Sequence, residues 1–180
     1  MQHEVMLARF GGQGILISAK ILARATMQEG REVAWVPSYG PEMRGGTAYC
    51  TVVISDRLIG TPVIRNPGYL LVMNRPSLEK FARQVKPNGT ILINTSLINI
   101  DSCRDDVHEL CIPVNDLAIK RGNVRTANIV ALGAFVAHTR LVDMQTLRAG
   151  VKSEFSQKTA MIALNLAALE EGQKAVMAPA

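Results

Sequence analysis

The sequence predicts a three-layer α/β domain built on a mostly parallel sheet, with an antiparallel element in its first third. Short apolar segments rich in β-branched residues alternate with longer helical segments along most of the 180 residues. A helix between two strands brings the chain back to its starting edge, so such strands run parallel. Only a loop separates the second strand from the third, which favours an antiparallel pair at that place. A chain of this length is sufficient for one domain with a substantial core.

The first predicted strand covers residues 5–9, a short apolar run that ends at a glycine turn. The first helix covers residues 15–29, which contain neither Gly nor Pro, and Gly30 is well placed to end it. Apolar side chains surround most of this helix, so we expect it to be buried on more than one side.

The second strand is expected at residues 33–36 and closed by Pro37. Residues 47–55 are rich in β-branched side chains and predict the third strand. These two strands form the expected antiparallel pair.

Helices and strands continue to alternate in the rest of the chain. Strands are predicted at residues 69–73, 90–94 and 109–114, and helices at 74–85, 116–121, 128–139, 143–152 and 155–171. Together these elements predict a Rossmann-like domain over residues 1–174, followed by a short tail at 175–180.

Composition excludes several classes of function. The net charge of +5 is spread along the chain, and aromatic residues make up only 4%. Nucleic-acid binding usually requires a clustered basic surface, often with stacking aromatic side chains, so no nucleic-acid partner is expected. No apolar run is long enough to span a membrane, and no signal peptide is recognisable. A cytoplasmic protein is the simplest expectation.

The three cysteines predict neither a disulfide framework nor a metal site. They include no Cys-x-x-Cys pair. Cys103, His108 and Cys111 are possible ligand types, but their spacing does not fit the usual paired-ligand zinc patterns. Nucleophile motifs such as Gly-x-Ser-x-Gly are also absent. We therefore assign neither a catalytic residue nor a metal ligand to this chain.

The first segment that points to a function is a glycine turn after the first strand, made of Gly11, Gly12, Gln13 and Gly14. Such a turn lets backbone approach a phosphate at the start of a helix, or it simply docks the helix on the sheet. A dinucleotide site is disfavoured, because bulky Ile17 occupies the position of the third glycine of that fingerprint.

The second segment follows the second strand and is rich in glycine. Its candidate site residues are Ser38, Tyr39, Glu42, Arg44, Gly45, Gly46 and Thr47. Arg44 offers a planar fork for a carboxylate or phosphate, with glycine amides as further donors. The segment either recognises a substrate, a coenzyme or a partner subunit, or is a solvated hairpin loop.

Asn74 also follows a predicted strand, at an edge where α/β sheets bind ligands. A polar residue in this position either caps the next helix or lines the same crevice as the glycine segments.

These segments resemble the gamma subunit of the 2-oxoacid:ferredoxin oxidoreductases. The resemblance lies in residues 10–15, in the ten residues 38–47, in Asn74-Arg75-Pro76-Ser77-Leu78 and in residues 128–134, and so extends over nearly the whole chain. Residues 38–47 are the specific part. The 2-oxoglutarate enzyme is the most similar type.

The resemblance implies a subunit of a multi-chain enzyme. Such an enzyme decarboxylates a 2-oxoacid on thiamine diphosphate, passes electrons through iron–sulfur clusters to ferredoxin, and forms an acyl-CoA with coenzyme A as co-substrate. Thiamine diphosphate, Mg²⁺ and the clusters are expected on alpha, beta and ferredoxin-like partner subunits, because this chain shows no motif for them.

Within such a complex, the chain would shape the side of the site that binds CoA or substrate. Arg44 is the first candidate for an anion contact, with Gly11, Gly12, Gln13 and Gly14 providing backbone donors. Ser38, Tyr39, Glu42 and Thr47 would hold the loop or touch a neighbouring subunit. Two alternatives stay open, a stand-alone module that binds a phosphorylated ligand and a subunit needed only for assembly.

Overall fold

The computed structural model describes residues 1–10, 13–38 and 47–177. Its strands are β1 (Gln2–Phe10), β2 (Glu32–Ser38), β3 (Thr47–Ser55), β4 (Tyr69–Val72), β5 (Thr90–Asn94) and β6 (His108–Ile112). Its α-helices are α1 (Gln13–Gln28), α2 (Arg75–Phe81), α3 (Val114–Lys120), α4 (Ala127–Thr139), α5 (Met144–Glu154) and α6 (Thr159–Met177). Two short 3₁₀ turns follow the second and third helices, η2 (Ala82–Gln84) and η3 (Val124–Thr126).

The strands form one six-stranded sheet in the order β2-β3-β1-β4-β5-β6. β3 is antiparallel to both of its neighbours, whereas β1 and β4 to β6 pair in parallel. The predicted combination of a mostly parallel sheet with an antiparallel element is therefore confirmed. From β1 the chain builds the sheet first in one direction, through α1 to β2, and later in the other, through β4. The reversal point lies between β1 and β4.

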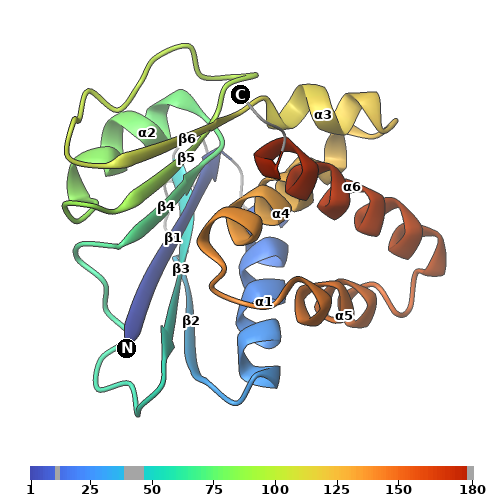
Figure 1. Cartoon of the computed structure of the whole chain (residues 1–180), viewed down its shortest axis with the longest axis horizontal. Helices are drawn as coiled ribbons and strands as arrows, with labels where there is room; N and C mark the ends of the chain where they lie inside the picture. Colours follow the sequence, from blue (N-terminus) through green and yellow to red (C-terminus); the bar gives the residue numbers. More distant parts are fainter. Residues whose placement is uncertain (11–12, 39–46, 178–180) are drawn as a thin grey trace.

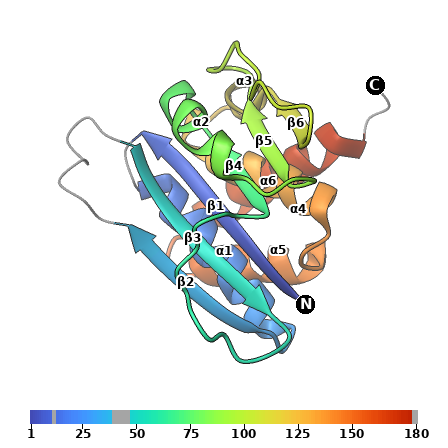
Figure 2. The ribbon, with the colours of Figure 1, turned by 90° about the vertical axis from the view of Figure 1, so that its left-hand side faces the viewer.

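Helices cover both faces of the sheet. α1, α4, α5 and α6 lie on one side, and α2 lies on the other (Figures 1 and 2). The two-residue period of β1 supplies both cores, because Val5 and Leu7 pack on the α1 side while Met6 and Ala8 pack on the α2 side. No helix in the described part of the chain is long and apolar enough to cross a membrane.

α4 is the most deeply buried helix of the larger layer. Every residue from Ala127 to Val136 is buried. α6 packs against it so closely that a Cβ atom at Gly133 would clash with the carbonyl oxygen of Leu169. A Cβ atom at Gly172 would clash in the same way with the carbonyl oxygen of Val130. Two glycines thus bring the backbones of α4 and α6 together.

The structure differs from the predicted elements mainly at their ends. β2 does not stop at Pro37 but pairs with β3 as far as Ser38. β2 is an edge strand, so a residue without an N–H group is tolerated there. At the other edge β6 ends at Ile112, and Pro113 occupies the N-cap position of α3, which therefore begins before the predicted residue 116.

The last helix also differs in its bounds. It begins at Thr159 instead of residue 155, because Phe155 occupies the C-cap position of α5. It continues to Met177, three residues into the segment that was expected to be a tail. Ala175 and Val176 pack against the core.

Candidate functional site at the carboxyl edge of the sheet

The flanks of both glycine segments lie side by side at one edge of the sheet. Phe10, the last residue of β1, pairs with Thr47, the first residue of β3. Ser38, the last residue of β2, pairs with Tyr49, two positions further along the same strand. β1 and β2 therefore end at the same edge, seen at the upper left of Figure 2. This is the carboxyl edge, where open α/β sheets bind their ligands.

Much of the predicted site falls outside the described residues. This applies to Gly11 and Gly12 and, in the second segment, to Tyr39, Glu42, Arg44, Gly45 and Gly46. Gln13 begins α1, Thr47 begins β3, and Ser38 is half-buried at the end of β2. The structure thus places the ends of both segments, and their roles as ligand contacts stay predictions.

Asn74 takes the N-cap position of α2, directly beyond β4. Its Oδ1 atom accepts a hydrogen bond from the hydroxyl of the buried Ser77, 2.5 Å away. Its backbone carbonyl accepts from the amide of Leu78. β4 is the neighbour of β1, so Asn74 lies beside the reversal point. Its side chain forms no hydrogen bond with a helix amide, and Ser77 is the side-chain partner that the structure gives it.

Asn94, at the end of β5, is fully buried, and its side chain is hydrogen-bonded within the protein. Its Nδ2 atom donates to Asn115 Oδ1 at 2.9 Å, and its Oδ1 atom accepts from the Val114 amide at 3.1 Å. It therefore fixes the start of α3 to the end of β5 instead of facing a ligand.

Gly14 lies in a polar junction between α1 and α4 that the sequence analysis missed. The Nδ2 atom of Asn128 donates to the Gly14 carbonyl at 2.8 Å and to Ser18 Oγ at 3.1 Å. Ser18 Oγ in turn donates to the backbone carbonyl of Asn128 at 3.1 Å. Ser18 and Asn128 are both buried, so these hydrogen bonds form away from bulk water and fix the first turn of α1.

Arg9 is the second feature that was missed. Its Nη1 atom lies 2.8 Å from the position that a Cβ atom would take on Gly14. Its signal in the sequence was a lone charge at the end of an apolar strand, directly before the glycine turn. Because residue 14 is a glycine, there is room for this guanidinium beside the first turn of α1.

The cysteines do not supply an activated thiol. Cys50 lies under α1, where burial raises the pKa of its thiol to about 12. A hydrogen bond with Asp101 raises the pKa of Cys103, and partial burial raises that of Cys111. Within the described residues, no three His, Cys, Asp or Glu side chains gather where they could hold a metal ion.

Comparison with known proteins finds similarity to oxidoreductases that act on 2-oxoacids. Residues 4–175 match the family described as pyruvate ferredoxin/flavodoxin oxidoreductase. The ketoisovalerate oxidoreductase subunit VorA of Methanothermobacter thermautotrophicus is 39% identical over 94% of this chain, which corresponds to 35% of that protein. The chain thus spans about a third of the length of this relative. The 2-oxoglutarate synthase subunit KorC of Methanocaldococcus jannaschii is 33% identical over 84% of this chain and 82% of its own length.

Solved structures agree with this comparison. The gamma subunit of a keto/oxoacid ferredoxin oxidoreductase from Geobacter sulfurreducens is 28% identical, with a TM-score of 0.87 over 98% of this chain and 99% of its own. A 2-oxoglutarate:ferredoxin oxidoreductase from Magnetococcus marinus, with 2-oxoglutarate, coenzyme A and succinyl-CoA bound, has a TM-score of 0.90 at 24% identity. The fit covers 99% of this chain and 32% of that one, and it establishes a shared fold.

Proposed function

The chain belongs to the pyruvate ferredoxin/flavodoxin oxidoreductase family, and on that basis we propose that it is the gamma-type subunit of a CoA-dependent 2-oxoacid:ferredoxin oxidoreductase. In this role it forms one wall of the site for CoA or the 2-oxoacid. Alpha, beta and ferredoxin-like subunits supply the rest of the enzyme.

The observation that carries the proposal is the position of the two glycine segments. Their flanking residues meet at the carboxyl edge of the sheet, where Phe10 pairs with Thr47 and Ser38 with Tyr49. Backbone amides at the start of α1 and the side chain of Arg44 are suited to hold an anionic group. CoA phosphates and the carboxylate of a 2-oxoacid are both groups of this kind.

The residues of this chain also agree with cofactors that lie elsewhere. An iron–sulfur cluster requires about four thiolates, and the chain has three cysteines in all. One of these, Cys50, is buried under α1 and stays protonated. Thiamine diphosphate, with its Mg²⁺ ion, supplies the carbanion chemistry when bound, and we place it on a partner subunit. The contribution of this chain is to bind and orient CoA or the 2-oxoacid and to enclose their site.

We propose 2-oxoglutarate as the substrate. The KorC relative carries that substrate in its name and matches this chain over 82% of its own length. VorA is named for ketoisovalerate, and this chain corresponds to only 35% of it. The two names differ in substrate, so a direct comparison of 2-oxoacids tests the proposal.

The experiment is to purify the chain with its partner subunits and to measure reduction of ferredoxin. We expect reduction to require a 2-oxoacid, CoA and all subunits, with 2-oxoglutarate preferred over pyruvate and 2-oxoisovalerate. The chain alone should show no turnover. Turnover by the chain alone, or a complex that oxidises none of the 2-oxoacids, would contradict the proposal.

Arg44→Ala tests the anion contact within that complex. We expect the KM for CoA to rise about tenfold to a hundredfold, because a charge-assisted hydrogen bond contributes roughly 1.5–3 kcal/mol. Arg65→Gln, which removes an exposed cation on the connection between β3 and β4, is the control. Unchanged CoA kinetics with intact assembly would remove Arg44 from the site. A complex that assembles but never brings this chain near CoA would favour the purely structural role.

A further inference from the structure

Arg9 differs from every other cation that the structure describes. It is half-buried, and no carboxylate, carbonyl or hydroxyl in the described residues accepts a hydrogen bond from its guanidinium. The other partly buried cations all form ion pairs with carboxylates: Lys20 with Glu154, Arg31 with Glu29, Arg104 with Asp106 and Arg148 with Glu170. Within the described ranges, a partly buried charge is thus balanced everywhere except at position 9.

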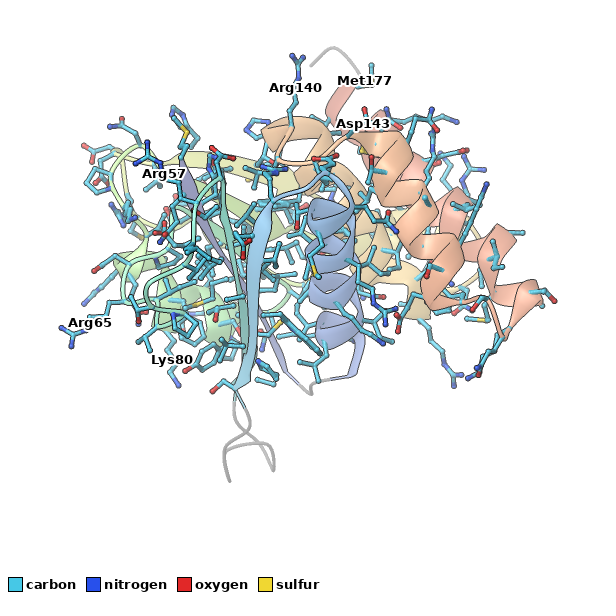
Figure 3. The ribbon with its side chains drawn as sticks, turned by 90° about the horizontal axis from the view of Figure 1, so that it is seen from below. Arg57, Arg65, Lys80, Arg140, Asp143 and Met177 are labelled. Atoms are coloured by element: carbon cyan, nitrogen blue, oxygen red, sulfur yellow. The ribbon has the colours of Figure 1, made fainter. Side chains whose placement is uncertain are left out.

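The exposed arginines provide a useful contrast. Arg65 and Arg140 point away from the molecule into solvent (Figure 3), where water satisfies a guanidinium at little cost. Arg9 is instead held at the end of β1, paired through its backbone with Ala48 and with its Nη1 atom against Gly14. Removing a charge from water without a partner is costly, so a counter-charge is expected at this position.

The neighbouring helices add positive potential of their own. α1 and α4 both begin close to Arg9, because Gly14 and Asn128 are the second residues of these helices and both border the Gly14 Cβ position that Nη1 approaches. The N-terminal end of a helix carries a partial positive charge. Acidic residues often offset this charge, but neither helix has one in its first turn. The local field favours an anion.

We propose that Arg9 binds an oxyanion of the enzyme's ligands, a CoA phosphate or the carboxylate of the 2-oxoacid. The identity of these ligands rests on the proposed function, whereas the lack of a partner for Arg9 among the described residues does not. The guanidinium donates two parallel N–H bonds to a phosphate or carboxylate, a geometry that lysine cannot reproduce. Arg9 is therefore a second anion contact beside the glycine turn, independent of Arg44.

Kinetics on the assembled complex test the assignment. Arg9→Gln removes the charge at similar length, Arg9→Lys retains the charge without the planar fork, and exposed Arg65→Gln, far from the start of α4, is the matched control. We expect R9Q to raise the KM for one ligand about tenfold and R9K to raise it less, with R65Q unchanged. A rise confined to CoA identifies a phosphate, and a rise confined to 2-oxoglutarate identifies the carboxylate. Unchanged KM values for both would overturn the assignment.

A binding measurement separates this inference from the proposed function, because it needs no turnover. The same complex is titrated with pyrophosphate and with oxalate by calorimetry. Weaker binding of either probe by R9Q than by wild type and R65Q supports the Arg9 site even if no 2-oxoacid is oxidised. If wild type binds neither probe, or R9Q binds both as tightly as wild type, the inference fails. It also fails if R9Q prevents assembly, since Arg9 would then pair with a partner's side chain.

Discussion

At the scale of single residues, Asn128 links the two helices that meet at the candidate site. Its amide group donates to a carbonyl in the first turn of α1 and to Ser18, and Ser18 returns a hydrogen bond to the backbone of α4. Because the partners are buried, loss of one leaves the others without water to replace it. The position of the first turn of α1 therefore depends on a side chain that lies 114 residues beyond Gly14 along the chain.

Asn128→Ala tests this link. We expect the free energy of unfolding to fall by about 1–3 kcal/mol, because the Gly14 carbonyl and Ser18 lose a buried donor. A double-mutant cycle with Ser18→Ala should show a coupling of at least about 0.5 kcal/mol. Urea denaturation of the full chain measures both values.

Asn165→Ala is the matched control for this cycle. Asn165 is equally buried, but its amide donates to the Met161 carbonyl within its own helix, α6. It should therefore show no coupling to Ser18→Ala. Additive effects for Asn128 and Ser18 would contradict the proposed link.

At the scale of elements, the contact of α4 with α6 depends on two glycines. Gly133 lies against the carbonyl of Leu169, and Gly172 lies against that of Val130. An exposed helical glycine is usually improved by alanine, by about 0.5–1 kcal/mol. At these two positions the added Cβ atom would meet rigid backbone, and overpacking typically costs about 1–3 kcal/mol. This cost should exceed the gain in helix propensity.

Gly172→Ala should therefore lower the free energy of unfolding by about 1 kcal/mol or more. Gly60→Ala is the control, because nothing lies within 4 Å of its Cβ position, and its effect should stay within about 0.5 kcal/mol. Chemical denaturation of the two variants and of wild type decides the matter. A neutral or stabilising Gly172→Ala would show that the two helices separate easily.

The sequence predicted those elements whose signals are local. Residues 90–94 were placed correctly as β5, and the β-branched side chains along residues 47–55 identified β3. The loop-only connection from β2 predicted their antiparallel pairing. Errors occurred where a tertiary contact overrides a local rule. Pro37 should end a strand, but at an edge with only β3 as partner it does not.

Of the candidate site, the sequence predicted only that the strand ends beside it lie at one edge of the sheet. Strand ends placed Gly14, Ser38 and Asn74 at one edge, because the carboxyl ends of parallel strands meet there. The polar junction of Ser18 with Asn128 joins residues 110 positions apart, and nothing in a single sequence pairs them. Arg9 was missed for a related reason, since its lack of a partner becomes visible only once its neighbours are known.

At the scale of the whole molecule, the two edges of the sheet have different character. At the amino edge, segments far apart in the chain contact one another. Lys86 pairs with Glu4 at 2.8 Å, and the Asn66 amide donates to the Gln84 carbonyl at 3.0 Å. Burial, followed by the charge of Arg31, lowers the pKa of His3, so its imidazole is neutral at pH 7. The carboxyl edge instead presents the first turns of helices and Arg9, whose guanidinium has no counter-charge within residues 1–10, 13–38 and 47–177.

This asymmetry predicts which edge meets the rest of the enzyme. The first amides of a helix lack partners within the helix, so they exchange hydrogen with water rapidly until something covers them. On assembly, we expect exchange to slow about tenfold or more in residues 13–18 and 73–78, at the starts of α1 and α2. Residues 57–67, which connect β3 to β4 along the amino edge, should exchange at the same rate in the chain alone and in the complex. Mass spectrometry of the two states makes this comparison. Protection confined to 57–67 would mean that partners dock on the amino edge, and the carboxyl edge could not then be the wall of a shared site.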